Sequence, residues 1–172
     1  MKKLLYLGII LMFASCNKNK PGKLGTDYQG GIVFYVDGNG GGLIAAPTDQ
    51  STGAVWGCQG TEIAGADGHD VGTGYQNTLD IEAGCDTAET AADICANLTL
   101  DGYEDWFLPS SSELNLMMEN LYLEGLGGFA SNIYWSSTEY DLNYAWIQDF
   151  NYGYLDAFAK SNAYYVRAVR AF

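Results

Sequence analysis

One stretch in the middle of the chain constrains the fold most, because it joins a short apolar strand to a helix. Trp106 to Leu108 form the expected strand, and Pro109 ends it, since proline cannot donate to a ladder. Ser110 and Glu113 have the spacing of a capping box, in which each side chain satisfies a free backbone donor at the helix start. Apolar residues then follow at the spacing of one helical face: Leu114, Met117, Met118 and Leu121. The sequence therefore predicts a strand-to-helix corner, with a helix that ends near Gly125.

The segments before this corner predict a β-hairpin, a long loop and two short helices. Residues 30–37 and 42–47 have the composition of strands, and the glycine-rich turn between them tolerates positive φ. Residues 48–76 show neither period, so we expect an irregular loop region there. Asn77 and Thr87 are each placed to cap a helix, and Gly84 is placed to end the first one.

After residue 132 the apolar pattern changes to a period of two, which is typical of strands. Four strands are expected, separated by turns, over residues 134–138, 144–150, 154–159 and 164–172. The predicted fold is therefore an α+β domain with an N-terminal hairpin, two to three helices, a long irregular loop region and a C-terminal antiparallel meander. Because the first hairpin and the last strand are both strongly apolar, we expect them to be neighbours in one sheet.

The first residues have the pattern of an export signal. Lys2 and Lys3 precede an apolar run over residues 4–13, and small residues then lead to Cys16. We interpret residues 1–15 as a lipoprotein signal peptide, Cys16 as the lipidated residue, residues 16–24 as a polar tether and residues 25–172 as the domain. The alternative is an ordinary cleaved signal with an incidental cysteine. Lipidation would anchor the protein in the bacterial cell envelope, since several acyl chains give stable membrane binding.

Charge is distributed unevenly along the chain. The whole sequence has a net charge of −13, but beyond residue 23 three basic side chains face 21 acidic ones. A domain this negative repels phosphate and sulfate, so nucleic acid is excluded as a partner and sulfated polyanions are disfavoured. We favour the interpretation of an acidic cell-surface domain over the alternative of several cation sites.

Three cysteines follow Cys16, and an exported protein meets an oxidising environment. Cys95 shares a helical face with apolar residues, which predicts a buried thiol. Cys58 and Cys85 both lie in glycine-rich, loop-like surroundings, so we predict a disulfide between them. A zinc site is not expected, because the sequence has one histidine and no paired Cys-x-x-Cys.

Aromatic residues and acceptors are interleaved in the late strands, a combination that suits a neutral glycan. Aromatic rings stack on the C–H groups of sugars, while carboxylates accept hydrogen bonds from hydroxyls. The alternative for any one ring is a core position, since half the positions of a strand point inward. The candidate ligand-binding residues are Trp135, Glu139, Tyr140, Tyr144, Trp146, Asp149, Tyr152 and Tyr154.

Other chemistry has weaker support in the sequence. The acidic residues around Asp105 and Asp141 match no EF-hand spacing, so calcium binding has no motif and no metal or cofactor is expected. His69 beside Asp70 has no evident nucleophile, and Ser110 is not in a Gly-x-Ser-x-Gly elbow. We therefore expect no enzymatic activity and leave the oligomeric state open.

Four segments together resemble the DUF1566 family, also called the Legionella collagen-like protein C-terminal domain family. They are residues 30–35, residues 102–114, residues 134–139 and residues 166–170. The resemblance implies a mixed fold similar to C-type lectins and formylglycine-generating enzymes. It also implies adhesion, although the sulfated ligands of the best-known member fit this acidic chain poorly. The calcium-dependent sugar-binding runs of C-type lectins do not occur here, and no cysteine follows Cys95 to support the enzymatic chemistry.

We therefore expect a cell-envelope lipoprotein with a non-catalytic, lectin-like domain for adhesion or glycan binding. The alternative is a structural envelope lipoprotein that binds a protein partner, and an enzyme is the third choice.

Overall fold

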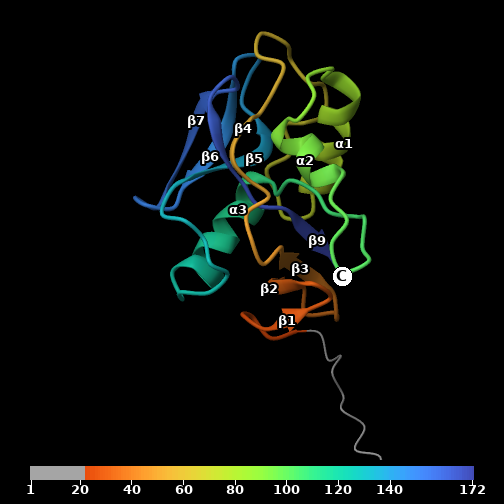
Figure 1. Cartoon of the computed structure of the whole chain (residues 1–172), viewed down its shortest axis with the longest axis vertical. Helices are drawn as coiled ribbons and strands as arrows, with labels where there is room; N and C mark the ends of the chain where they lie inside the picture. The colour runs from red at the N-terminus through yellow and green to blue at the C-terminus, as the bar shows by residue number, and fades with distance from the viewer. Residues whose placement is uncertain (1–21) are drawn as a thin grey trace, which may run out of the picture.

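A computed structural model describes residues 22–172, so the expected signal peptide, Cys16 and most of the tether lie outside the described residues. The fold is α+β, as predicted. One sheet has the order β1-β2-β3-β9 and the other has the order β4-β8-β5-β6-β7. Figure 1 shows the first sheet at one end of the molecule, the second sheet and helices α1 and α2 at the other, and α3 between them. The strands are β1 (Asp27–Tyr28), β2 (Gly31–Val36), β3 (Gly42–Ala45), β4 (Ser51–Val55), β5 (Ile133–Glu139), β6 (Tyr144–Asp149), β7 (Tyr154–Ala159), β8 (Ala163–Val166) and β9 (Val169–Ala171).

The strand-to-helix corner forms around the predicted capping box. The Ser110 hydroxyl accepts a hydrogen bond from the Glu113 N–H, and the Glu113 carboxylate accepts one from the Ser110 N–H. Helix α3 (Ser111–Met117) continues into a π-helical segment, η1 (Met118–Tyr122), and turns carry the chain to Gly125. The strand expected before the corner is reduced to one bridge between Phe107 and Val169. It goes no further because the Thr78 side chain, instead of a ladder partner, bonds the N–H and the C=O of the next residue, Leu108.

Both predicted helix caps are wrong. Helix α1 (Gly74–Gly84) begins three residues before Asn77, which is buried and bonds the N–H and the C=O of Gly68. Helix α2 (Ala91–Ala96) is capped by Thr90, whose hydroxyl accepts from the Asp93 N–H at 3.1 Å. Asn77 and Thr87 therefore contact other segments of the chain and do not cap the helices that the local pattern predicted for them.

The predicted pairing of the first hairpin with the last strand is confirmed. Strands β2 and β3 form the expected hairpin, and β9 pairs with β3 on its other side. The predicted last strand is nevertheless divided, because β8 joins the other sheet. The chain changes sheets at Arg167, whose buried guanidinium donates to the Ala46 and Gly127 carbonyls and lies over the Phe129 ring.

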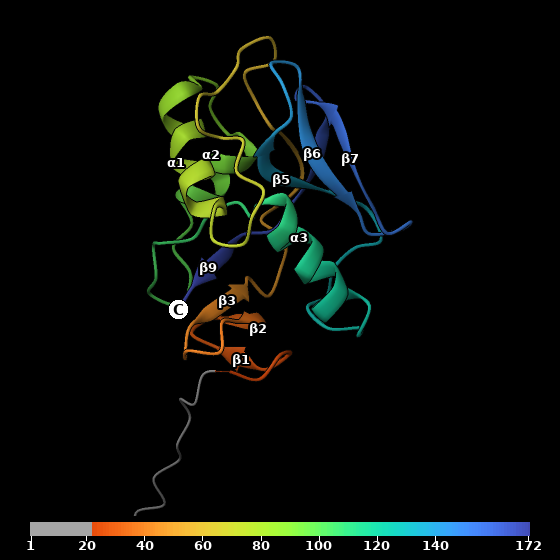
Figure 2. The same cartoon turned by 180° about the vertical axis from the view of Figure 1, so that it is seen from behind.

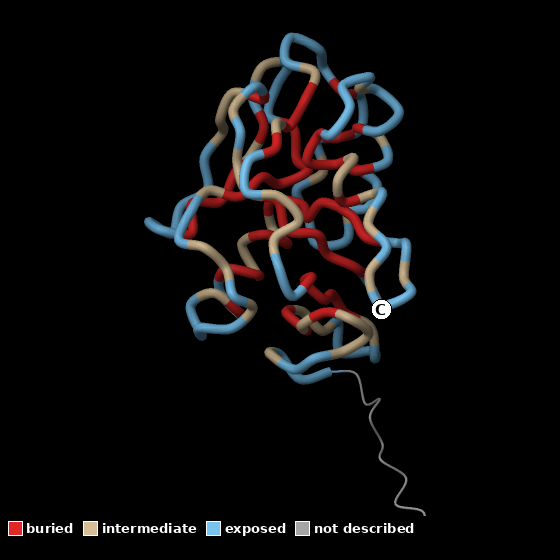
Figure 3. The backbone as a smooth tube through the Cα atoms, in the orientation of Figure 1, coloured by how far each residue is buried: buried red, intermediate tan, exposed pale blue. Residues whose placement is uncertain are grey.

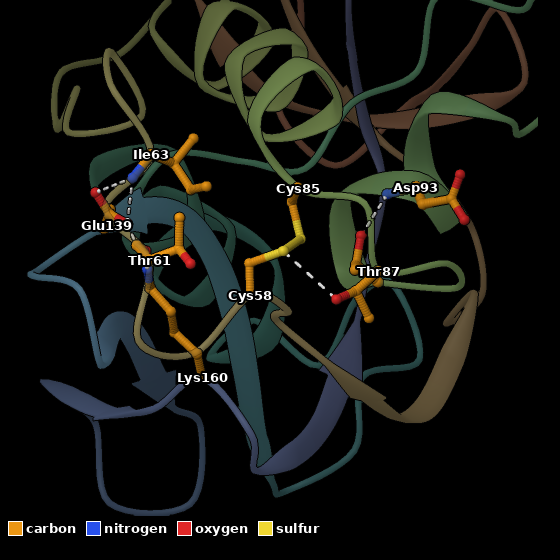
Figure 4. Close-up of a disulfide and its surroundings, with 9 residues drawn as sticks. Cys58, Thr61, Ile63, Cys85, Thr87, Asp93, Glu139 and Lys160 are labelled. Atoms are coloured by element: carbon orange, nitrogen blue, oxygen red, sulfur yellow. Dashed lines mark hydrogen bonds and ion pairs between the residues drawn. A yellow bond between two sulfur atoms is a disulfide. The ribbon is translucent and has the colours of Figure 1, made fainter.

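The segment expected to be a long loop contains β4, which pairs with β8 and has an irregular register. Its sequence, Ser-Thr-Gly-Ala-Val, carries little strand signal of its own. The rest of the segment is held in place by tertiary contacts (Figure 4). The predicted disulfide is confirmed, with the Cys58 and Cys85 Cα atoms 5.6 Å apart. Next to it, buried Lys160 forms an ion pair with Glu139 and donates to the Thr61 carbonyl, while Glu139 accepts from the Ile63 N–H.

Strand β5 lies between two buried clusters of apolar side chains. Trp135 belongs to the cluster that includes Trp56 and Trp106, whereas Tyr134 belongs to the cluster that includes Phe34 and Phe150. Consecutive residues of a strand point to opposite faces, so β5 is covered on both sides. Figure 3 shows this buried backbone in the middle of the molecule, with exposed loops around it. Cys95 also lies in the first cluster, and burial raises the pKa of its thiol, which keeps the thiol protonated.

Candidate functional site

A pocket of about 330 Å³ opens on the outer part of the second sheet, where β6 and β7 form a hairpin (Figure 2). Its lining residues are Tyr140, Tyr144, Trp146, Asp156 and Ala157. The register of the hairpin explains the hollow. Trp146 pairs with Ala157 and Tyr144 pairs with Ala159, so each large ring on β6 faces a methyl group on β7. The volume is at the lower end for small-molecule sites.

The third ring reaches the pocket because the chain folds back between β5 and β6. The N–H groups of Tyr140 and Asp141 both donate to the Tyr144 carbonyl, and the Asp141 carboxylate accepts from the N–H groups of Asn143 and Tyr144. This turn places the Tyr140 ring edge-on to Trp146, with ring centroids 5.5 Å apart and planes at 78°. Tyr140 is 58% exposed and Tyr144 is 42% exposed, so both rings are accessible to a ligand.

Asp156 is the carboxylate of the pocket. It is exposed on the edge strand β7, and its Oδ1 atom accepts a 2.8 Å hydrogen bond from the Ala157 N–H. The Lys160 N–H donates to the Asn143 carbonyl, so that pair is hydrogen-bonded, and the alternation of an antiparallel ladder makes Trp146 and Ala157, three pairs along, a non-hydrogen-bonded pair. The Ala157 N–H therefore points away from β6, and its bond holds the carboxylate at the open edge of the sheet.

The corner at the start of α3 supports this pocket from behind. The exposed His69 ring lies edge-on to Trp146, with centroids 5.5 Å apart, and its Nδ1 atom is 2.8 Å from the Ser111 hydroxyl. Thr138 at the end of β5 joins the two segments, since its hydroxyl donates to the Gly68 carbonyl and accepts from the Ser111 N–H. The loop that carries His69 is thereby fixed to both the helix and the sheet.

Glu113 holds the same loop further along. Its buried carboxylate accepts hydrogen bonds from the N–H groups of Gly72 at 2.7 Å and Ser110 at 2.8 Å. Burial raises the pKa of Glu113 above its ordinary value, and the backbone donors oppose this shift without cancelling it. The function of this group is thus to order the loop and the helix start.

Three of the predicted ligand-binding residues are not available to a ligand. Trp135 is fully buried and donates from its indole N–H to the Ala54 carbonyl at 2.9 Å. Glu139 is the buried partner of Lys160. Asp149 is 5% exposed, and it accepts from the N–H groups of Asn151 and Tyr152 in the turn after β6. The prediction that these three residues contact a ligand is therefore wrong, because tertiary packing covers each of them.

The remaining predicted residues lie on two separate surfaces. Tyr140, Tyr144 and Trp146 meet in the pocket, as described above. Tyr152 and Tyr154 stack on each other at the far end of β7, with ring centroids 6.4 Å apart and planes at 16°. Tyr154 pairs with Asp149 and not with a pocket residue, and its position in the alternation is that of the opposite sheet face. The structure thus brings together three of these five rings, namely the exposed Tyr140 and Tyr144 and the half-buried Trp146.

Two residues of the pocket region were missed by the sequence analysis. Asp156 looked like an ordinary strand position, and His69 looked like a residue of a surface loop. The register of the β6–β7 hairpin pairs Asp156 with Ile147, so strand alternation alone places it on the sheet face opposite to Trp146. Its carboxylate reaches the pocket at the open edge of the sheet, where the Ala157 N–H holds it, and no local pattern predicts that contact. No local signal connects His69 to Trp146, because 77 positions separate them in sequence and only the fold brings them together.

Among the described residues 22–172, no group of three or more His, Cys, Asp or Glu side chains is arranged to hold a metal ion. The same part of the chain contains no helix with the length and apolar character needed to cross a membrane.

The two sheets, the helical corner and the disulfide define an α+β domain. The chain belongs to the Lcl C-terminal domain family, whose sequence profile matches residues 46–170. Its fold is similar to that of a fimbrial protein from Bacteroides ovatus ATCC 8483, with 19% identity and a TM-score of 0.50. The similarity covers 74% of this chain and 35% of that one, so the present chain spans about a third of the fimbrial protein. A search of curated proteins finds no significant match.

Proposed function

We propose that this chain is a cell-envelope lipoprotein whose domain binds carbohydrate at the β6–β7 pocket and serves in adhesion. The observation that carries the proposal is the group of three accessible rings and one carboxylate in a single hollow. Rings stack on the C–H faces of sugars, and a carboxylate oxygen accepts hydrogen bonds from hydroxyls, so this lining suits a small polar ligand. Family membership and the shared fold with a fimbrial protein support a location at the cell surface. We further propose that the fold is C-type-lectin-like, which fits the paired terminal strands.

A glycan array tests the binding site. We expect wild-type protein to bind a subset of glycans and the Trp146→Ala variant to lose that binding. Tyr152→Ala is the matched control, because Tyr152 is an exposed ring outside the pocket. Running the array with and without calcium tests our expectation that no cofactor is needed. Binding that survives Trp146→Ala, or that no glycan produces, contradicts the proposal.

The lipid anchor has its own test. Palmitate labelling of cells that express the full chain is expected to mark the wild-type protein and not the Cys16→Ala variant. Labelling that persists in the variant contradicts lipidation at Cys16.

A second candidate function, docking of a protein partner, has one specific observation in its favour. Strand β7 is the outer strand of its sheet, has six residues, pairs with β6 without a bulge and contains neither proline nor lysine. Short length, bulges, proline and lysine normally protect the edge of a sheet, and β7 lacks all of them, so it is able to accept a strand from another protein. We propose no catalysis, because Ser111 beside His69 is buried in the first turn of α3.

A further inference from the structure

Three basic side chains of the domain are buried in ion pairs with its own carboxylates. Lys160 pairs with Glu139, Arg167 pairs with Asp49 at 2.7 Å, and Arg170 pairs with Asp105. All three cations are at least nine-tenths buried. Within residues 22–172 this leaves Lys23, at the start of the described chain, as the only exposed lysine or arginine. The surface therefore presents many carboxylates and almost no compensating positive charge, which favours a cationic ligand over an anionic one.

The lining of the pocket is also negatively charged and, among the described residues, contains no cation. Its one charged lining residue is Asp156, and within residues 22–172 the single hydrogen bond of that carboxylate is the one from the Ala157 N–H to Oδ1. The Oδ2 atom is thus free to bind a ligand. The nearby imidazole of His69 is not a lining residue, and its Nδ1 atom is hydrogen-bonded to the Ser111 hydroxyl.

The aromatic walls add a second attraction for positive charge. The Tyr140 and Trp146 rings stand almost perpendicular to each other, and Tyr144 completes the lining on the same strand as Trp146. The face of an aromatic ring is negative and its edge is positive, so a cation that lies over a ring face of this lining is attracted to that ring. A lining of aromatic rings and one unpaired carboxylate suits a ligand with an apolar C–H face and one positively charged atom better than it suits a neutral ligand.

We infer that the ligand of this pocket is a sugar with a free, protonated amino group, in other words a de-N-acetylated amino sugar. The sugar ring packs on Trp146, and the ammonium group lies between the Asp156 carboxylate and the aromatic rings. This inference rests on the proposed carbohydrate-binding function and specifies its ligand class. A sulfated sugar is disfavoured in the same pocket, since a sulfate would face Asp156 without a cation to balance it.

The test compares three β-1,4-linked tetramers that differ at the C2 position: glucosamine, N-acetylglucosamine and glucose. Binding is measured by calorimetry or tryptophan fluorescence at a pH about one unit below the pKa of the sugar amine, so that the amine is charged. We expect the glucosamine tetramer to bind about fivefold to tenfold more tightly than the other two. Added salt should weaken binding of the glucosamine tetramer and leave binding of the two neutral tetramers unchanged.

Asp156→Asn is the decisive variant, because asparagine can still accept from the Ala157 N–H while the charge is lost. It should remove the preference for the glucosamine tetramer and leave glucose binding unchanged. Asp86→Asn is the control, since Asp86 is an exposed carboxylate outside the pocket and its loss changes the net charge equally. Equal losses in both variants would assign the preference to the overall charge and overturn the inference.

The remaining outcomes distinguish the inference from the function on which it rests. If the neutral tetramers bind as tightly as the cationic one and Trp146→Ala abolishes that binding, the inference is wrong and the carbohydrate site stands. If Asp156→Asn weakens all three tetramers equally, Asp156 binds hydroxyl groups and the inference is again wrong. If no tetramer binds and the glycan array is also empty, both proposals fail.

Discussion

Strands β5 and β7 belong to the same sheet and both contain aromatic side chains, yet they use them in opposite ways. In β5 every residue from Tyr134 to Glu139 is buried, because an apolar cluster packs on each face. In β7 every residue is exposed or partly exposed, and no strand within residues 22–172 pairs with its outer side. An aromatic residue therefore signals core or surface only once the position of its strand in the sheet is known.

The largest effect is expected when the buried side of this comparison is broken. Trp135→Ala in β5 removes a fully buried indole that packs on Tyr164 and donates to the Ala54 carbonyl. We expect the free energy of unfolding to fall by about 3–5 kcal/mol, as for other large-to-small core substitutions. Urea unfolding at neutral pH measures the loss, and Tyr154→Ala in β7 is the matched control. A loss below about 1 kcal/mol for Trp135→Ala would contradict the assignment of β5 to the core.

The ion pair that joins the end of β5 to the residue after β7 should come next. Lys160→Met leaves the Glu139 carboxylate buried without its cation, and we expect a loss of about 3 kcal/mol. The Trp56 ring also loses the ammonium group, whose nitrogen lies 4.6 Å from its centroid. Chemical unfolding of the single variant and of a Lys160→Met/Glu139→Leu double variant separates the two contributions.

The double variant should recover part of the stability, because the unpaired charge is gone and only two neutral backbone groups, the Ile63 N–H and the Thr61 carbonyl, lose their side-chain partners. If the double variant is as unstable as the sum of both single variants, the two side chains act independently and the ion pair is not the cause.

A smaller effect, with a characteristic pH dependence, is expected at Glu113. Burial raises its pKa above the ordinary value, so the folded state holds this proton to higher pH than the unfolded state does. Its contribution to stability is therefore present below pH 4.5 and is lost as the pH rises through the pKa of the folded state. The difference in unfolding free energy between wild type and Glu113→Gln should thus decrease as the pH rises from below 4.5 to neutral.

At acidic pH we expect Glu113→Gln to cost about 1–2 kcal/mol, since a glutamine cannot accept from both the Gly72 and Ser110 N–H groups. Urea titrations across this pH range measure the difference, and Glu124→Gln, on an exposed carboxyl, is the control. A difference that does not vary with pH would show that the Glu113 pKa is not raised.

These substitutions also show which parts of the fold were predictable. The capping box, the first hairpin, the antiparallel β5-β6-β7 part of the meander and the disulfide are predictable because each depends on residues close in sequence or on a small set of cysteines. The fourth strand of the predicted meander is wrong, because β8 lies on the other side of β5 and pairs with it in parallel. Strand β4 and the division of the last strand at Arg167 are not predictable in this way, because distant partners create them. The same limit applied to the site. The sequence indicates aromatic residues near positions 135–154, but it does not show which of them are buried. Their exposure depends on the apolar clusters that pack on both faces of β5 and leave β7 uncovered.

The smallest effect is expected where the exposed side of the comparison is changed. Tyr152→Ala removes a ring that is 76% exposed and stacks only on Tyr154, which is itself exposed. A surface substitution of this kind changes the free energy of unfolding by less than about 0.5 kcal/mol.

Tyr140→Ala should behave in the same way, since its ring contacts Trp146 from the solvent side of the pocket. Thermal or urea unfolding measures both. A loss above about 1 kcal/mol would mean that these rings stabilise the fold, and their exposure would then need no ligand to explain it. If stability is unchanged while Tyr140→Ala weakens sugar binding, the Tyr140 ring contributes to recognition and not to folding, in contrast to the buried rings of β5.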